Sequence, residues 1–177
     1  CKRRYAGVDF GGGDPTAIVM LGVTARGHVH QYSEFYRVGN VTVEDIAEYI
    51  WRWHHEGKLT TVECDPSEPV ATASLQALRL PARAADNRRG EGLANVDFLL
   101  SHNRLSLDDR SCPFSIREFS GYRWRERVDP NSRDRYKTGT PVDHHADAMD
   151  ARRYAVMRII KDETLRIEAQ AVPMEFR

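Results

Sequence analysis

Acidic side chains follow two apolar segments of the chain at the points where those segments end. Asp9 stands near the end of residues 5–10, just before three consecutive glycines, and Asp65 directly follows residues 59–64. Glycine has no side chain, so another backbone or a phosphate group can approach the Asp9 carboxylate closely. Glu63, two residues before Asp65, shares its face if that segment is a β-strand. Each acid also fits an ordinary role as a polar residue at a strand end or turn.

Three more aspartates lie at the start of a long helical pattern near the end of the chain, at positions 143, 147 and 150. In a helix, residues three and four apart lie on one face, so these carboxylates face the same way. Acids in a first helical turn are common because they interact favourably with the helix dipole, and Asp143 fits that role. Asp150 lies two turns in, where aspartate is unfavourable and the charge of Asp147 repels it. A divalent cation would offset that repulsion.

Carboxylates from three separate parts of the chain indicate chemistry with a hard metal ion. Oxygen ligands, without cysteines or histidines at zinc-like spacing, are typical of Mg²⁺ or Mn²⁺ sites. Two such ions, about 3.5–4 Å apart, can bind both the attacking water and the leaving oxygen of a phosphodiester. This reaction needs no side-chain nucleophile, and the sequence shows no convincing catalytic triad. The residues alone therefore point to metal-dependent phosphodiester hydrolysis.

Apolar periodicity predicts the elements that must bring these acids together. Strands are expected at residues 5–10, 16–24, 28–38, 59–64, 82–85 and 105–107. Helices are expected between Thr42, a good N-cap, and Gly57, and over 68–80 with Ser67 as N-cap, 92–101 and 143–160. Residues 113–120 fit either a helix or a strand, and 123–139 should form a polar loop. This order predicts an α/β fold with a mixed sheet, antiparallel in its first three strands and parallel afterwards, flanked by helices.

The size and composition suit one folded domain. We expect the 177 residues to form a domain over residues 1–160 and a charged tail over 161–177. The 41% hydrophobic content excludes a disordered chain, and no apolar run reaches the roughly 18 residues that a membrane span needs. Three cysteines without paired spacing favour reduced thiols in a cytosolic protein. The start without methionine suggests a domain excised from a longer protein.

Charge is segregated along the chain, although 26 basic residues balance 26 acidic ones. Residues 110–137 hold eight Lys or Arg and four acids, with Tyr122, Trp124 and Tyr136 between them. Basic side chains neutralise phosphates without reading base sequence, so this stretch is a candidate contact with the DNA backbone. A solvated loop would have a similar composition. The candidate DNA-binding residues are Arg88, Arg89, Arg123, Arg125, Arg127, Arg133, Arg135 and Lys137.

Several of these motifs resemble the nuclease domain of tailed-bacteriophage terminase large subunits. The matching segments are 8–11, 63–69, 118–124 and 143–155, in the right order. The most specific pieces read Asp-Pro-x-Glu-Pro and Asp-Ala-x-Arg-Tyr-Ala, and the resemblance runs over about residues 5–158. It implies an RNase H-like fold. It also implies a metal-dependent DNA endonuclease that cuts concatemeric viral DNA when packaging starts and ends.

The resemblance also implies roles for individual acids. By position, Asp9, Asp65 and Asp150 match the family's catalytic, metal-binding acids. Asp14 and Asp147 match accessory acidic positions, and we count Asp147 among the expected metal ligands. Whether Glu63 helps to bind metal stays open, and we treat it as accessory. The expected cofactors are Mg²⁺ or Mn²⁺, with two ions.

The resemblance further implies partners outside this chain. No segment reads G-x-x-x-x-G-K-[ST], so the ATPase half of a large terminase is absent from the sequence. The implied partners are double-stranded DNA, the ATPase domain of the full-length protein, the portal and a small terminase subunit, with no membrane. The implied location is the host bacterial cytoplasm.

Three other functions remain compatible with the sequence. A junction resolvase or a transposase-type nuclease would keep the fold and change the substrate. A non-catalytic DNA-binding assembly module would use the acids only to cap helices. A phosphotransferase of the sugar-kinase and actin type also begins with a strand and an Asp-x-Gly-Gly loop, but it normally needs two such domains.

Overall fold

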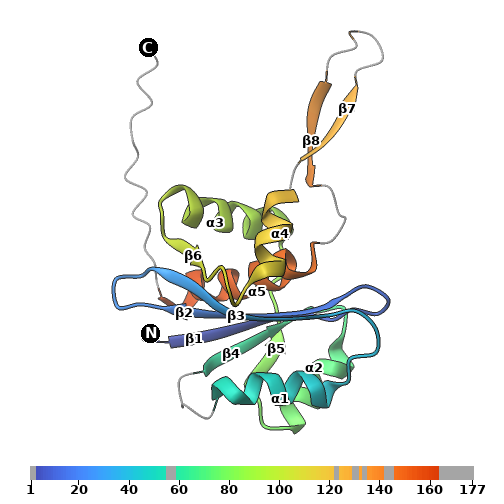
Figure 1. Ribbon diagram of the computed structural model, residues 1–177, viewed down its shortest axis with the longest axis vertical. Helices are drawn as coiled ribbons and strands as arrows, with labels where there is room; N and C mark the ends of the chain where they lie inside the picture. The colour runs from blue at the N-terminus through green and yellow to red at the C-terminus, as the bar shows by residue number, and fades with distance from the viewer. Residues whose placement is uncertain are drawn as a thin grey trace.

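A mixed six-stranded sheet lies at the centre of the molecule (Figure 1). The computed structural model describes residues 3–54, 59–121, 124–128, 132, 135–141 and 146–163. The strands of the sheet are β1 (Arg3–Asp9), β2 (Thr16–Val23), β3 (Val29–Arg37), β4 (Leu59–Cys64), β5 (Ala82–Ala84) and β6 (Leu105–Leu107). Their spatial order is β5-β4-β1-β2-β3-β6, with β1–β2 and β2–β3 antiparallel and the other neighbours parallel. The predicted mixed sheet is therefore confirmed.

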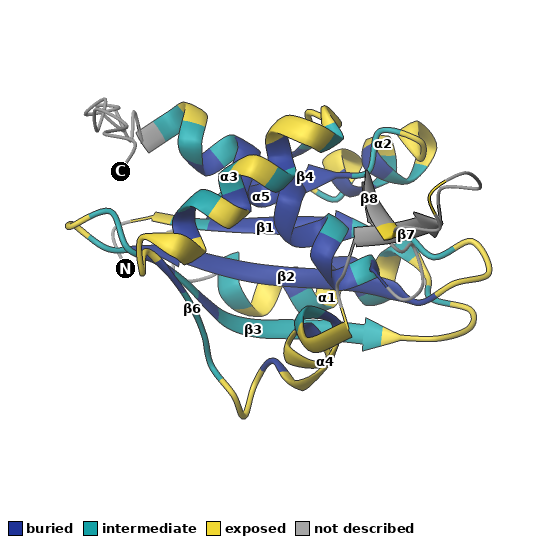
Figure 2. Cartoon of the chain, turned by 90° about the horizontal axis from the view of Figure 1, so that it is seen from above, coloured by how far each residue is buried: buried dark blue, intermediate teal, exposed yellow. Residues whose placement is uncertain are grey.

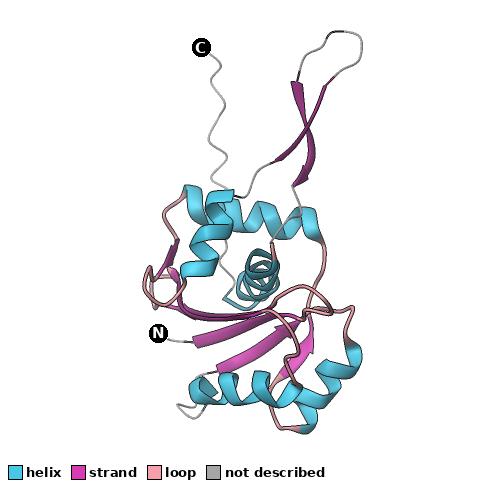
Figure 3. Cartoon of the chain, turned by 45° about the vertical axis from the view of Figure 1, so that its right-hand side comes forward, coloured by secondary structure: helices cyan, strands magenta, loops and turns pink. Residues whose placement is uncertain are grey.

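Helices cover both faces of this sheet (Figures 1 and 3). One face carries α1 (Val43–His54) and α2 (Pro69–Ala77), and the other carries α3 (Arg89–Ser101), α4 (Pro113–Gly121) and α5 (Asp147–Glu163). Thr42 caps α1 as predicted, since its hydroxyl accepts a hydrogen bond from the Asp45 N–H at 3.1 Å. No helix in the described part of the chain is both long and apolar enough to cross a membrane.

Strand β1 sends alternate side chains into two separate cores. Ala6 and Val8 pack in the core that α1 and α2 cover, whereas Tyr5 packs in the core that α3 and α5 cover. Because side chains alternate along a strand, Asp9 faces the side of α5. The neighbouring strand β2 is buried over its whole length, which keeps β1 inside the sheet (Figure 2).

Gly7 lets α5 cross β1 at very short range. A Cβ atom at Gly7 would lie 1.8 Å from the carbonyl oxygen of Ala151 and 3.3 Å from the Cβ of Ala155. Only a residue without a side chain fits there. The face of α5 that packs on the sheet also carries small residues, among them the buried Ala148, so the helix backbone can lie close to the strands. This close crossing brings the first turn of α5 to the end of β1.

The helix α4 resolves the ambiguity over residues 113–120. Glu34 on β3 accepts hydrogen bonds from the N–H groups of Phe114 and Ser115, at 2.6 and 3.0 Å. A carboxylate distant in sequence thus caps the helix. No pattern within residues 113–120 predicts this cap. The predicted N-cap at Ser67 is wrong. The helix α2 begins at Pro69, its N-cap residue is Glu68, and it has no side-chain cap. The Ser67 N–H donates to Asp65 in the preceding turn.

The expectation of a loop over residues 123–139 is also wrong. Two strands, β7 (Trp124–Val128) and β8 (Arg135–Pro141), pair there as an antiparallel hairpin that projects away from the sheet (Figure 1). The two strands pair with each other as a separate sheet. The residues of the two strands do not alternate between apolar and polar types, so the sequence carried no strand pattern. The helix α5 begins at Asp147, four residues after its predicted start, and continues to Glu163, three residues past its predicted end. The expectation that Asp150 lies two turns into this helix is therefore wrong, because Asp150 lies in the first turn.

Candidate functional site

Three elements bring four aspartates to one edge of the sheet. Asp9 ends β1, Asp65 directly follows β4, and Asp147 and Asp150 lie in the first turn of α5. Parallel pairing of β1 with β4 places the first two side by side, and the Asp65 N–H donates to the Val8 carbonyl at 2.9 Å. We call these four residues the acid cluster. Asp143 lies outside the described residues.

The raised pKa of Asp9 indicates that the other acids of the acid cluster lie close to it. Burial is the largest effect that raises the Asp9 pKa, from its ordinary value of 3.8 to about 8. The negative charges of Asp150, Asp65 and Asp147 raise it further, in that order. Burial and negative charges of the acid cluster, Asp9 first among them, also raise the pKa of the nearby Tyr154 hydroxyl. A site with this much repulsion would gain free energy from a bound cation.

A buried guanidinium holds Asp150 in place. Arg153, 2% exposed, lies with its Nε 3.0 Å from a carboxylate oxygen of Asp150. Its Nη2 donates to the side-chain oxygen of Asn87 at 2.9 Å. Gly92 on α3 leaves room for the Arg153 stem, since a Cβ there would lie 2.4 Å from the arginine Cγ. In the sequence, Arg153 stands out only as part of the Asp-Ala-x-Arg-Tyr-Ala motif, and nothing in the motif predicts this contact.

Asp147 has neighbours that sequence analysis also missed. The Tyr36 hydroxyl, from the end of β3, donates to Asp147 at 2.9 Å. Burial and this hydrogen bond raise the pKa of Tyr36. Glu118 on α4, 6% exposed, accepts a hydrogen bond from the Met149 N–H at 3.0 Å. Burial raises the pKa of Glu118 to about 7, and the charge of Asp147 contributes in the same direction. The segment containing Glu118 carried a family resemblance, whereas nothing in the local pattern marked Tyr36.

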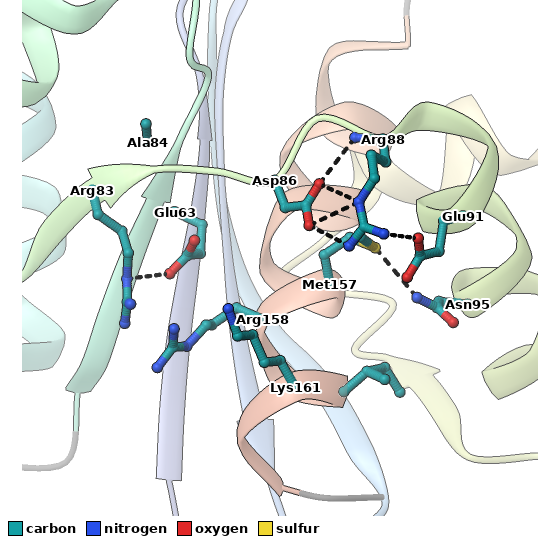
Figure 4. Close-up of a pocket in the computed structure, with 11 residues that line it drawn as sticks. Glu63, Arg83, Ala84, Asp86, Arg88, Glu91, Asn95, Met157, Arg158 and Lys161 are labelled. Atoms are coloured by element: carbon teal, nitrogen blue, oxygen red, sulfur yellow. Dashed lines mark hydrogen bonds and ion pairs between the residues drawn. The ribbon is translucent and has the colours of Figure 1, made fainter.

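The two accessory acids lie in different surroundings. Asp14 is exposed in the turn after β1. Glu63 is buried and forms an ion pair with Arg83 at 2.8 Å and a hydrogen bond with Thr61 at 2.8 Å. Its pKa is raised chiefly by burial. Glu63 lines a pocket of about 340 Å³, together with residues of α3 and α5 (Figure 4). Its described contacts are those of a structural ion pair.

The candidate DNA-binding residues do not lie together: Arg88 lines this pocket, and four others lie in the hairpin β7–β8. Arg88 points between Asp86, at 2.6 Å, and Glu91 (Figure 4), and Arg89 begins α3. Arg125 and Arg127 lie in β7, and Arg135 and Lys137 lie in β8. Arg123 and Arg133 fall outside the described residues. Four of the eight candidate DNA-binding residues thus lie in one hairpin.

The residue types of the acid cluster suit a divalent metal ion, but the present arrangement is not a finished ligand set. In the ranges that the structure describes, no three carboxylate, imidazole or thiolate side chains already converge as a metal site. The four aspartates provide hard oxygen donors, and their mutual repulsion is the property that Mg²⁺ or Mn²⁺ would relieve. Binding would therefore draw the carboxylates closer together.

Comparisons with known proteins identify the fold. No protein-family model and no curated protein matches the sequence. Among solved structures, the large terminase of a thermophilic bacteriophage, in complex with ADP, is 24% identical, with a TM-score of 0.74 over 90% of this chain and 40% of that one. The large-terminase nuclease domain of bacteriophage SPP1 with bound Mn is 23% identical, with a TM-score of 0.70 over 88% and 86%. The P22 nuclease domain is 17% identical, with a TM-score of 0.68 over 88% and 81%.

These similarities concern the whole architecture of the described chain. The chain spans about 40% of the length of the thermophilic-phage large terminase, but most of the separate SPP1 and P22 nuclease domains. The expected RNase H-like fold, with its mixed sheet and flanking helices, agrees with these structures. The identities are low, so the likeness is one of fold: this chain has the fold of the phage large-terminase nuclease domains.

Proposed function

We propose that this chain is a metal-dependent DNA endonuclease that cuts concatemeric viral DNA during genome packaging. One observation carries the proposal: β1, β4 and α5 bring four aspartates together at one sheet edge, in a fold shared with terminase nuclease domains. In open α/β sheets, the carboxyl ends of the strands are where ligands bind. The sequence resemblance supports the same function from the motifs alone.

The proposed ligands are Asp9, Asp65 and Asp150, with Asp147 as a further, accessory ligand. The raised pKa of Asp9 supports this assignment, because a cation would offset the charges that raise it. When bound, Mg²⁺ or Mn²⁺ would favour ionisation of the attacking water and neutralise charge on the phosphodiester. The bound Mn of the SPP1 nuclease domain supports the choice of metal. Two ions are proposed.

The remaining residues of the site orient the acids. Arg153 holds one oxygen of Asp150, and Tyr36 donates to Asp147. Both contacts reduce the freedom of the carboxylates, and the Arg153 guanidinium also balances part of their charge in the metal-free protein. Asp14 and Glu63 stay accessory candidates, with Glu63 already paired to Arg83.

The proposed partners follow from the same argument. The substrate is double-stranded DNA, whose backbone would meet the basic hairpin β7–β8. In the full-length protein the chain would be joined to an ATPase domain, consistent with its 40% coverage of the thermophilic-phage large terminase. We also propose that the full-length protein binds the portal and a small terminase subunit. It would act in the host bacterial cytoplasm.

Cleavage of supercoiled plasmid tests the proposed function. We expect nicked and linear products with Mg²⁺ or Mn²⁺ and none in excess EDTA. Asp9→Asn, Asp65→Asn and Asp150→Asn should each abolish cleavage while the fold is kept, and Asp147→Asn should reduce it. Asp97→Asn removes an exposed carboxylate on α3 and should cleave like the parent. Robust cleavage in EDTA, or full activity of Asp150→Asn, would contradict the proposal.

A further inference from the structure

Glu118 caps α5 from a different helix. Its carboxylate on α4 accepts the Met149 N–H, and Met149 is the third residue of α5. The first N–H groups of a helix lack partners within that helix, so an outside acceptor fixes where the helix starts. Met149 lies between Asp147 and Asp150 in sequence, so the contact acts on the turn that carries both acids of α5.

A buried polar network supports this cap. Arg152 is fully buried, with its guanidinium carbon 4.1 Å from the Phe119 ring centroid and its Nε donating to Gln31 at 2.8 Å. Gln31 in turn donates to the Ser115 hydroxyl at 2.7 Å. These contacts join β3, α4 and α5. Hydrogen bonds are stronger in such a buried place than in water, so they restrict the three elements to one arrangement.

Glu118 occupies an electrostatically unfavourable position. A residue that is kept there despite this cost is expected to have a role beyond packing. It is a buried carboxylate beside Asp147, and burial raises its pKa to about 7. An apolar residue would avoid that cost. The Met149 N–H, the Tyr36 hydroxyl and the Arg152 guanidinium act in the opposite direction and favour the ionised carboxylate.

We propose that Glu118 is a positioning residue that fixes the first turn of α5, so that Asp147 and Asp150 meet Asp9 and Asp65 as metal ligands. The inference rests on the proposed metal-dependent function. Glu118 acts through the backbone of Met149 and is not itself a ligand. A merely structural role would lower the stability of the fold without changing the metal affinity of the folded protein.

Calorimetric titration of the metal-free chain with Mn²⁺ tests this inference, at a temperature where each variant is folded. Removing a group that orients a metal ligand, without binding the metal itself, typically lowers the metal affinity by about 10–100-fold. Glu118→Ala should therefore weaken Mn²⁺ binding by at least about tenfold. Glu118→Gln keeps a carbonyl acceptor of the same reach and should restore most of the affinity. Thr72→Ala, a buried polar change in α2 on the other face of the sheet, should cost stability but leave the affinity unchanged.

The outcomes separate this inference from the proposed function. If the parent chain binds no Mn²⁺, the proposed function fails and the inference fails with it. If the parent binds and Glu118→Ala binds equally well, the positioning role is overturned and the proposed function stands. If Glu118→Ala does not fold, Glu118→Asp replaces it. Aspartate is one methylene too short to keep the contact with the Met149 N–H, so the Glu118→Asp protein should bind Mn²⁺ more weakly than the Glu118→Gln protein. Equal affinities would overturn the positioning role.

Discussion

Asp9 carries an electrostatic cost that comes from its burial and from the three other acids of the acid cluster. It is the aspartate that the other three act upon, and burial removes the water that would otherwise stabilise its charge. In the metal-free protein this cost appears as lost stability. The raised pKa of Asp9, which supports its assignment as a metal ligand, therefore also makes the free energy of unfolding depend on pH.

The sign of that dependence follows from proton binding. Folded Asp9 keeps its proton up to about pH 8, whereas the unfolded residue releases it near 3.8. The folded state thus binds more protons within this window, and stability falls as the pH rises from about 4 to about 8. In EDTA, Asp9→Asn should flatten this decline and be more stable than the parent above about pH 8. Some decline should remain, because the pKa of Glu118 is raised as well.

Thermal melts across this pH range, with Asp97→Asn as the control, check the prediction. The control removes an exposed charge and should melt in parallel with the parent. Melting curves of Asp9→Asn that run parallel to the parent from pH 4 to 8 would mean that Asp9 is not perturbed as described.

The crossing of α5 over β1 is the feature at the element scale on which the site depends. The helix lies so close at Gly7 that any Cβ would meet backbone rather than a movable side chain. A side chain there must push the whole helix outward. Because α5 carries Asp147 and Asp150, stability and site geometry change together at this position.

Gly7→Ala should therefore destabilise the fold by about 1–3 kcal/mol or more, as overpacking does. It should also reduce the increase in melting temperature produced by Mn²⁺, since that increase scales with affinity for the folded state. Gly12→Ala is the matched control. A Cβ at Gly12 meets nothing within 4 Å, and its backbone is not left-handed, so the change should be neutral or slightly stabilising. Equal melting temperatures for the two variants would contradict the close crossing.

The hairpin β7–β8 is the second element with a testable role. Replacing Arg125, Arg127 and Lys137 by alanine should weaken DNA binding for all sequences alike. The slope of log affinity against log salt should shrink by up to about 0.9 for each lost phosphate contact. Fluorescence anisotropy with two unrelated duplexes measures both effects. An unchanged slope would assign DNA binding to another surface.

At the scale of the whole molecule, opposite charges occupy different places while the net charge stays at zero. The acid cluster lies at one sheet edge, and four of the candidate DNA-binding residues lie in the hairpin β7–β8, which projects beyond the helices (Figure 1). Such a distribution attracts a polyanion to one part of the surface without making the protein basic as a whole.

The chain by itself should hydrolyse no ATP, although the thermophilic-phage large terminase was crystallised with ADP. The sequence has no phosphate-binding loop of the G-x-x-x-x-G-K-[ST] type, and it spans about 40% of that larger protein. Phosphate release from Mg²⁺-ATP should match a protein-free blank under conditions where plasmid is cut. ATP hydrolysis that co-elutes with the chain in gel filtration would contradict this division of functions.

Local sequence patterns determined the elements with a buried face and the acids at their ends. The apolar runs of β1 and β4 predicted both strands, and the turns after them marked Asp9 and Asp65 as strand-end residues. Burial imposes a period on the residues of such elements, and a period can be read within one segment. The order of the elements predicted a mixed sheet, but only the structure showed that these two strands are parallel neighbours.

Only the tertiary structure decided the contacts between distant segments. Glu34 caps α4, Glu118 caps α5, and Tyr36 reaches Asp147, each across a separation with no local signal. The hairpin β7–β8 was missed for a related reason, since its strands pair with each other and show no apolar alternation. The periodicity of apolar residues indicates which residues are buried. It does not indicate which buried polar groups form hydrogen bonds with each other. Such partners exist only once the sheet and helices have packed, so the sequence predicted the acids and the fold determined how they are held.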